Sequence, residues 1–308
     1  MARADVMFSI EGMPRTMPHE NIPVREDLAF ANAAGKEKKR VRNFAEKMLK
    51  TLAEPLQKRL KKDEVVLYIC RANSPMKTLE QLSFGHYAQL VAGAALVVTN
   101  TRMLAFRITY QNNWTKSLRE VAWADVRQAK VKGWLTGHLD LEYRNGKKER
   151  YWGIAIPDKK KLNLLVEKLA AESQGEAQGV GEMCSRCPEC LATLKPGNYE
   201  CPQCGLVFKQ EKQVYWRALV PGLAYVYTGH PFLGIADGLG ELTGIILLFL
   251  GIVGVVTGDK DGPLFLGIGT FIFGFDYLIC ITHNLRFVRE FLATKEHRAE
   301  VGMVATGR

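Results

Sequence analysis

Hydrophobic positions follow three successive rhythms along the chain. Over residues 26–62, apolar residues recur every three or four positions, which predicts an amphipathic helix that Pro55 should kink or split. Over residues 63–172 the rhythm changes to short apolar runs, which are typical of strands. Over residues 233–285, two long apolar stretches predict helices that could cross a membrane. Residues 1–25 show no sustained period, so we expect a flexible N-terminus without a signal peptide.

The segment 26–62 is strongly basic, and its apolar face has two possible uses. Eleven Lys/Arg stand against three Glu over residues 36–62, which gives most of the net charge of +10. Such a helix could lie on anionic lipid heads. It could instead pack on a neighbouring element and leave its charges in water, which is the commoner use of an amphipathic helix. The sequence favours packing and leaves open whether the segment contacts a membrane.

Residues 63–172 carry the signals of a strand-rich domain that is closed by a helix. The apolar runs predict strands at residues 65–69, 94–98, 103–108, 121–126, 139–143 and 151–156. Asn145-Gly146 predicts a tight hairpin turn with positive φ at both residues. The closing helix carries Leu162, Leu165 and Leu169 on one face, and Asp158 is placed to cap its first amides.

This domain resembles the bacterial pleckstrin-homology-like (PH-like) and GRAM-like family. The resemblance rests on LVVTNTRMLAF (residues 96–106), SLREVAWADVRQAKV (117–131), the hairpin over 133–152 and the helix after it. It implies a β-barrel or sandwich with a C-terminal helix that serves as an interaction module for protein or lipid. A head-group pocket would need converging basic residues, for which Arg71 and Lys77 are candidates by proximity. The stretch 81–93 departs from the family pattern.

Five of the seven cysteines lie within residues 184–204. Cys187-Pro-Glu-Cys190 and Cys201-Pro-Gln-Cys204 are separated by ten residues, a spacing that suits four thiolates around one tetrahedral ion. Cys184 also stands at C-x-x-C distance from Cys187, so a shifted register is the alternative. The repeated Cys-Pro-x-Cys pattern resembles the zinc-ribbon family.

The ribbon resemblance implies a structural Zn²⁺, because four thiolates leave no open position for water. Pro196-Gly197-Asn198 would form the turn between the two knuckles, and Gly205 would relieve strain after the second. A redox pair or an iron–sulfur ligand set could use the same residues. A thioredoxin-type pair would require a surrounding βαβ pattern, which the sequence lacks.

The C-terminal hairpin consists of apolar stretches at 233–257 and 263–282, joined by a short polar turn. Basic residues flank both outer ends, which predicts that both termini are cytoplasmic. Pro221, Gly222, Leu223, Tyr227 and Gly229 precede the first stretch and resemble the entrance of a bacterial two-transmembrane hairpin family. Ala224 and His230 depart from that family's pattern. The resemblance implies a short helix before the first span. It informs the expected membrane topology more than the activity of the chain.

Three acids lie inside the apolar stretches: Asp237, Glu241 and Asp276. Intramembrane acids suggest ion or proton handling. The sequence favours the other interpretation, in which they lie at head-group depth and pair with His230, His283 or Arg286. Glycines at small-xxx-small spacing would let helices pack closely, either within the hairpin or between copies in a homo-oligomer.

Together these patterns predict a multi-domain α+β membrane protein. Its expected parts are a flexible N-terminus (1–25), a basic amphipathic helix (26–62), a PH-like domain (63–172), a linker (173–183), a zinc ribbon (184–212), an interfacial entrance helix (213–232), a transmembrane hairpin (233–285) and a basic cytoplasmic tail (286–308).

No G-x-S-x-G, P-loop, H-E-x-x-H or Rossmann fingerprint is found, so we expect no enzyme. The expected function is the display of cytoplasmic modules on the inner membrane of a bacterium, for binding protein or lipid heads. No nucleic-acid partner is expected. The alternative is a subunit of an oligomeric channel or transporter that uses the intramembrane acids.

Overall fold

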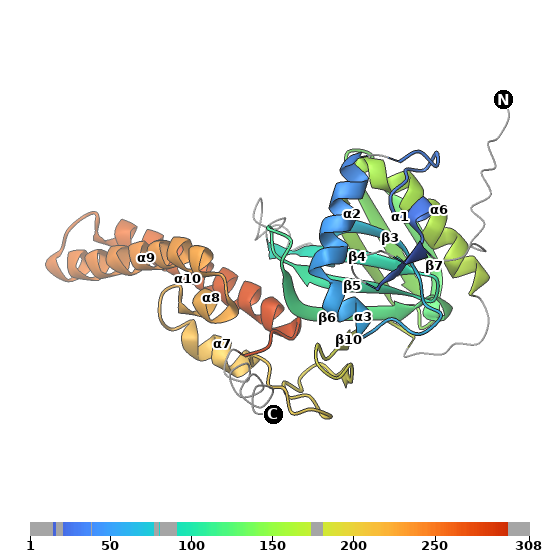
Figure 1. The fold of residues 1–308 in the computed structure, drawn as a ribbon. Coiled ribbons are helices and arrows are strands. Elements are labelled where there is room, and N and C mark those ends of the chain that lie inside the picture. Colours follow the sequence, from blue (N-terminus) through green and yellow to red (C-terminus); the bar gives the residue numbers. More distant parts are fainter. Residues whose placement is uncertain are drawn as a thin grey trace. The chain divides into compact units, whose positions relative to one another are not determined.

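The computed structural model describes residues 15–16, 21–37, 39–76, 80, 91–173 and 181–294. Lys77, most of the expected linker and part of each expected terminal segment lie outside these residues. By its internal contacts the chain divides into two compact units. The first, here called the sheet unit, comprises residues 1–77 and 85–194, and the second, the hairpin unit, comprises 78–84 and 195–308 (Figure 1). The domain bounds expected from the sequence stay predictions.

The sheet unit is built on one large, mostly antiparallel sheet in the order β11-β10-β6-β5-β4-β3-β9-β8-β7. The strands are β3 (Val66–Asn73), β4 (Gly93–Thr99), β5 (Arg102–Ile108), β6 (Trp114–Ala122), β7 (Val126–Lys132), β8 (Gly137–Tyr143), β9 (Lys148–Ile154), β10 (Cys184–Arg186) and β11 (Thr193–Leu194), with β1 (Arg15–Thr16) and β2 (Pro23–Val24) at the side, where β2 pairs with β3 in parallel.

The expected barrel is not closed. Strands β3 and β9 meet through one pair, Asn73 and Trp152, while β7 and β11 form the two ends of the strand order. The reason lies at β6, whose outer edge is taken by β10, with Cys184 opposite Glu120. Since that edge is already paired, β7 cannot hydrogen-bond to it and complete the ring.

Strands β3 to β5 are buried on both faces, which explains their uninterrupted apolar runs. On β4, Leu96 and Val98 belong to one hydrophobic cluster and Ala95 and Val97 to the other. The first cluster includes side chains of β8 and of helix α6 (Ile156–Glu172). The second includes the apolar faces of helices α2 (Lys39–Thr51) and α3 (Ala53–Gln57). The sheet is therefore covered on both sides.

The single helix expected over 26–62 is instead three helices: α1 (Glu26–Ala29), α2 and α3. The break before α3 is at Leu52, so Pro55 falls in the first turn of α3, where its missing N–H is not needed. Met48, Leu49, Leu52 and Leu56 are fully buried against the sheet. This apolar face is therefore used for packing and is not available to lipid tails.

The predicted strand at 121–126 is also divided. Strand β6 ends at Ala122, a short 3-10 turn covers Trp123–Asp125, and β7 begins at Val126. Trp123 is fully buried there, and its indole N–H donates to the carbonyl of Thr99 at 2.8 Å. Trp123 and Ala124 continue the apolar run into the turn, so the hydrophobic pattern alone could not separate it from a strand.

The hairpin turn between β8 and β9 is present, but only Gly146 takes positive φ, at 80°. Asn145 keeps negative φ and uses its side-chain oxygen to accept the Lys147 amide at 3.0 Å. This is the three-residue kind of hairpin loop, in which a turn is followed by one left-handed glycine.

Helix α6 begins two residues before Asp158, and the structure shows no side-chain cap at its N-cap, Ala155. The expected capping role of Asp158 is therefore wrong. Pro157 occupies the first turn, where proline favours helix initiation. Asp158 instead accepts a hydrogen bond from the Tyr68 hydroxyl at 2.6 Å, which ties the start of the helix to β3.

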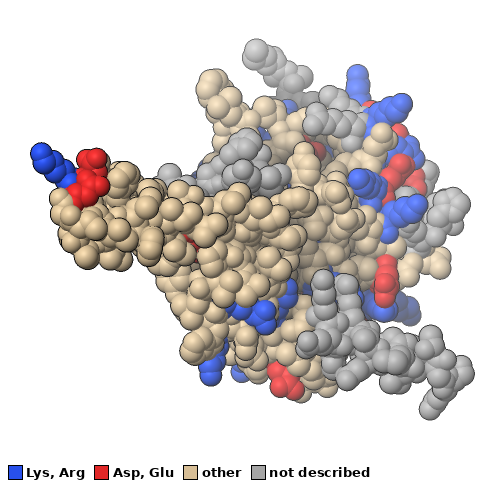
Figure 2. All heavy atoms as spheres, turned by 90° about the vertical axis from the view of Figure 1, so that its left-hand side faces the viewer, with Lys and Arg blue, Asp and Glu red and all other residues tan. Residues whose placement is uncertain are grey.

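The hairpin unit contains α7 (Glu211–Arg217), α8 (Leu223–Thr228), α9 (Pro231–Thr257) and α10 (Gly262–Arg289). Two of them, α9 and α10, are long and apolar enough to cross a membrane. Within the most apolar 18-residue stretch of each helix, only 22% of α9 and 11% of α10 is buried inside the structure. Figure 2 shows uncharged surface along this pair, with charged residues gathered at its tip, the turn over residues 258–261. The expected single entrance helix is two short helices, because Pro221-Gly222 interrupts it.

Glycines bring α9 and α10 into backbone contact. A Cβ placed on Gly251 would lie 2.3 Å from the amide nitrogen of Leu266, and one on Gly269 would lie 2.5 Å from that of Leu248. Neither helix could accommodate a side chain at these positions without moving apart. Of the glycines at small-xxx-small spacing, Gly244 and Gly254 make the same kind of contact, since an added Cβ would lie 2.9 Å from the amide nitrogen of Phe273 and 2.7 Å from the Cα of Gly262.

Candidate metal centre and hairpin acids

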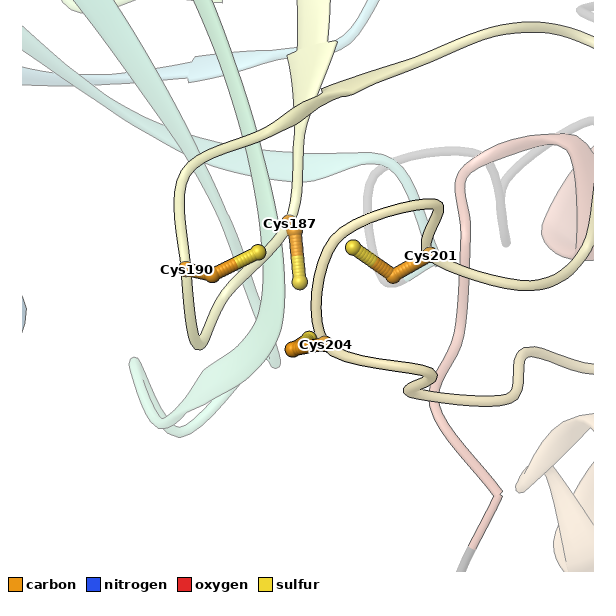
Figure 3. A group of neighbouring side chains, drawn as sticks. All are labelled: Cys187, Cys190, Cys201 and Cys204. Atoms are coloured by element: carbon orange, nitrogen blue, oxygen red, sulfur yellow. The ribbon is translucent and has the colours of Figure 1, made fainter.

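Four cysteines converge from two loops, as Figure 3 shows: Cys187 and Cys190 follow β10, and Cys201 and Cys204 come from the second loop. Their four sulfur atoms all lie within 4.8 Å of one another. Around a tetrahedral ion with Zn–S bonds of about 2.3 Å, neighbouring sulfurs would be roughly 3.8 Å apart. The observed cluster is close to that arrangement, so these residues could hold a metal ion.

The two loops repeat the same backbone hydrogen bonds. In the first loop, the Cys187 amide donates to the Ala192 carbonyl at 2.9 Å, and the Leu191 amide donates to the Cys187 carbonyl at 3.1 Å. In the second loop, the Cys201 amide donates to the Leu206 carbonyl at 2.9 Å, and the Gly205 amide donates to the Cys201 carbonyl at 3.0 Å. Each loop therefore closes around its own pair of thiols.

The residue after each C-x-x-C pair takes left-handed φ, at 65° for Leu191 and 69° for Gly205. The sequence signalled this conformation only for Gly205, because leucine adopts it rarely. The equivalence of the two positions could have been found by aligning the repeated Cys-Pro-x-Cys pattern. The predicted turn between the knuckles is also present, with Gly197 at φ 86° and the Asn198 amide bound to the Lys195 carbonyl at 3.1 Å.

Cys184 lies in β10 outside this cluster of four. It is buried, and its thiol donates to the carbonyl of Glu182 at 3.3 Å. Its strand is fixed to β6 by pairing and by an ion pair between Arg186 and Glu120 at 2.8 Å. The structure thus brings together the four cysteines of the two repeated pairs and places the fifth in the sheet.

Arg59 anchors the first knuckle, a role that the sequence did not suggest. Its side chain is buried, donates to the carbonyl of Pro188 inside the Cys187–Cys190 loop, and donates to the carbonyl of Pro55 at 2.8 Å. A guanidinium beside this loop would favour a metal bound through thiolates, because it brings positive charge close to them. Such outer-shell contacts orient metal ligands and tune their affinity.

The four entrance residues, Pro221, Gly222, Tyr227 and Gly229, form a compact elbow before α9. A Cβ on Gly222 would lie 1.9 Å from the carbonyl oxygen of Gly234, so only glycine fits there. The Tyr227 hydroxyl accepts the Gln210 amide at 3.0 Å, and the ring lies 4.3 Å from the guanidinium carbon of Arg217. Gly229 ends α8 with φ of 91°. These contacts give a physical reason for each residue of the motif except Pro221.

The acids Asp237 and Glu241 lie on α9 beside Cys280 of α10, with possible ligand atoms within 4.8 Å of one another. Glu241 is 1% exposed and accepts the Gly222 amide at 3.0 Å through one oxygen. Its other oxygen and Oδ2 of Asp237 are buried without a hydrogen-bond partner among the described residues. Asp276 lies against the backbone of α9 at Gly240. A Cβ added to Gly240 would be only 2.5 Å from Oδ2 of Asp276.

The residues expected to pair with these acids have other partners. His283 shares a 2.5 Å hydrogen bond with the Tyr225 hydroxyl, and His230 stacks on Phe287 with ring centroids 4.0 Å apart. Arg286 forms ion pairs with Glu80 at 3.0 Å and Glu290 at 3.2 Å. Thr228 donates to Asn284 at 2.6 Å, which adds to this buried polar network between α8 and α10. No pattern along the chain pointed to that network.

Arg71, one candidate for a head-group pocket, is used at the turn between β5 and β6. It donates to the side chain of Asn112 at 2.8 Å and lies over the ring of Tyr110. The other candidate, Lys77, lies outside the described residues.

A scan against protein-family models finds no match to the chain, and a search of curated proteins finds no matching relative. The PH-like, ribbon and hairpin-family resemblances therefore rest on the residues quoted for them. The structure itself establishes a mixed α+β chain with a large antiparallel sheet, a cluster of four cysteines that could hold a metal ion, and two apolar helices at the C-terminal end.

Proposed function

We propose that this chain is a non-enzymatic, membrane-anchored protein that displays a PH-like module and a zinc ribbon on the cytoplasmic side, for binding protein or lipid head groups. The observation that carries the proposal is the convergence of four cysteine sulfurs shortly before two long apolar helices. A structural metal would supply the folding energy that such a small loop module cannot obtain from its own core.

The PH-like assignment is supported by the order of elements in the sheet unit. Four antiparallel strands, β3 to β6, turn a corner at Trp123–Asp125 into three more, β7 to β9, and α6 follows directly. Leu162, Leu165 and Leu169 of α6 share one core with residues from both groups of strands. This is the strand-rich layout with a closing helix on which the resemblance rests.

Membrane anchoring is supported by the apolar surface of the hairpin unit. Exposed large side chains continue from α9 and α10 onto α7 and the turn after it, where Trp216 is 63% and Leu219 62% exposed. Lys209, Lys212 and Arg217 stand beside them in the sequence. Tryptophan next to basic residues is typical of the head-group region of a bilayer.

The metal is tested with the full chain purified in detergent. We expect about one zinc per chain in the wild type, as four thiolates around one ion require. Cys201→Ser should lose the metal, whereas the matched variant Cys184→Ser should keep it, because Cys184 lies in β10 outside the cluster. Iron in place of zinc, or a disulfide with no metal, would contradict the structural zinc site. Alkaline carbonate extraction of membranes tests the anchor, since a peripheral chain would be released.

A second candidate function is a subunit of an oligomeric cation or proton pathway. It is favoured by the buried, unpartnered oxygens of Asp237 and Glu241 next to Cys280. Buried carboxylate oxygens that lack a hydrogen bond within the described residues are costly, and buried acids are a mark of functional sites in membranes. Two helices per chain are too few to enclose a pathway, so several copies would be needed. Ion flux into proteoliposomes that is lost in Glu241→Gln and retained in Asp259→Asn, a change in the turn, would favour this function over simple display.

A further inference from the structure

Two adjacent apolar side chains project from the sheet unit into solvent. Trp134 is 88% exposed and Leu135 is 72% exposed, more than any other large hydrophobic residue described in that unit. Elsewhere in the described chain, only Phe232 and Val256 exceed 70% exposure, and both belong to the helix α9 that could span a membrane. Because burying apolar surface away from water is favourable, an apolar environment would stabilise both side chains.

The loop that carries them, residues 133–136, is held in one shape. It joins β7 to β8, and Gly133 takes φ of 109° there. A Cβ on Gly133 would lie 2.1 Å from the carbonyl oxygen of Thr136, so the turn requires glycine. The ammonium group of Lys159, from the first turn of α6, donates to the carbonyl of Gly133. The exposed pair is therefore presented on a supported turn.

The surroundings of this loop are basic. Lys130 and Lys132 are exposed on β7, and Lys160 is exposed next to Lys159 on α6. The carboxylate of Asp140 is shared by two of the nearby cations, Arg150 at 2.6 Å and Lys132 at 3.6 Å, so positive charge remains in excess around the loop. Ile156, 60% exposed at the start of α6, adds a third apolar side chain to this end of the unit. Apolar residues among lysines match a bilayer with anionic heads, since tails accept the former and head groups attract the latter.

We infer that the loop 133–136 inserts Trp134 and Leu135 into the head-group region of an anionic lipid bilayer. This inference rests on the proposed membrane anchoring and narrows the binding partner of the sheet unit to a lipid surface. The occupant is a bilayer because charge complementarity favours it and because α9 and α10 would keep the chain at one. Tryptophan is well suited to this depth, since its ring is amphipathic.

The test uses full-length Trp216→Phe protein in nanodiscs, so that Trp134 is the only strongly exposed tryptophan that remains. Its fluorescence is quenched either by brominated lipid tails or by aqueous iodide, and Trp134→Phe in the same background gives the blank. With phosphatidylglycerol mixed into phosphatidylcholine, we expect Trp134 emission to be quenched by bromine and protected from iodide. Pure phosphatidylcholine, or Lys132→Gln with Lys160→Gln, should abolish the bromine quenching.

Each other outcome overturns the inference. Quenching by iodide alone would place Trp134 in water, and protection from both quenchers would place it under protein, such as a second copy. Equal bromine quenching in pure phosphatidylcholine would show that no anionic surface is recognised. Failure of the proposed anchoring is seen separately, because the chain would then dissociate from the discs. A chain that stays in the discs with Trp134 in water loses only this inference.

Discussion

Arg59 lies outside the cluster of four cysteines but contacts its first loop. It is buried, and its guanidinium binds the carbonyl of Pro188 between the first two cysteines. We expect Arg59→Gln to lower zinc affinity about 10- to 100-fold, as the loss of outer-shell contacts does in other sites. Competition with a chromophoric zinc chelator measures this change in the full chain.

Lys58→Gln is the matched control for Arg59→Gln, since Lys58 is exposed and its partner is Glu54 at 2.7 Å. Its zinc affinity should equal that of the wild type. Equal affinity in both variants would show that the contact with Pro188 does not support the site. An unchanged far-ultraviolet circular dichroism spectrum checks that Arg59→Gln remains folded; tryptophan fluorescence is unsuitable because Arg59 lies over the ring of Trp114.

Lys161 is fully buried in the sheet unit, where it donates to the carbonyls of Leu28 and Ala31 and lies over the ring of Tyr68. Burial lowers the pKa of Lys161 from 10.5 to about 8. Between these pH values the unfolded chain holds the proton more tightly, so stability should rise with pH by up to about 3 kcal/mol. Below pH 8 both states are protonated, and the contribution no longer changes.

Lys161→Met tests this linkage because methionine keeps the length and apolar stem without a charge. Denaturant unfolding followed by tryptophan fluorescence, from pH 7.5 to 10, should show a rise in stability for the wild type that is smaller in the variant. The difference between the two proteins isolates Lys161 from other groups that titrate in this range. Parallel curves would mean that the buried lysine is not linked to folding.

At the scale of single residues, the sequence pointed to those residues whose chemistry is local and repeated. The cluster of four cysteines could be anticipated because each C-x-x-C pair brings its two thiols together locally, whatever the rest of the fold. Arg59 and Lys161 were missed because their roles depend on carbonyls of Pro188 and Leu28, each more than a hundred positions away. A lysine or arginine in a helical pattern otherwise indicates a solvated face.

At the scale of elements, the strands were predictable and the breaks between elements were not. Strands β3 to β5 stand out as apolar runs because both of their faces are buried. The corner at Trp123 was concealed because Trp123 is fully buried and prolongs the apolar run between β6 and β7. The division between α2 and α3 was expected at Pro55 but occurs at Leu52, since proline is compatible with a helix's first turn.

The close contact of α9 and α10 gives a prediction for the hairpin. Gly251→Ala would place a Cβ 2.3 Å from the backbone of Leu266, so the helices must separate, at about 1–3 kcal/mol for such overpacking. Gly267 has no atom within 4 Å of the same position, so Gly267→Ala should be neutral or slightly stabilising. Unfolding by denaturing detergent, followed by circular dichroism, compares the two. Equal stabilities would mean that this contact does not hold the hairpin.

For the whole molecule, the distribution of charge predicts which side of a membrane each part would face. Lys209, Lys212 and Arg217 precede the hairpin, and Arg286 and Arg289 end it. The turn over 258–261 holds two aspartates and only one cation, Lys260. Because basic residues are retained in the cytoplasm, both ends of the hairpin should be cytoplasmic, with the turn on the other side.

Lys260 provides a direct measurement of this arrangement, since it is the only lysine between Lys212 and Lys295. A membrane-impermeant amine reagent should label Lys260 from outside in right-side-out vesicles, and Lys260→Arg should remove that label while keeping the charge. In inside-out vesicles the same reagent should label Lys195 of the cysteine loops and spare Lys260. The reverse pattern would put the cysteine cluster outside the cytoplasm, where thiols meet oxidising conditions. The four cysteines would then be expected to form disulfides in place of a zinc site.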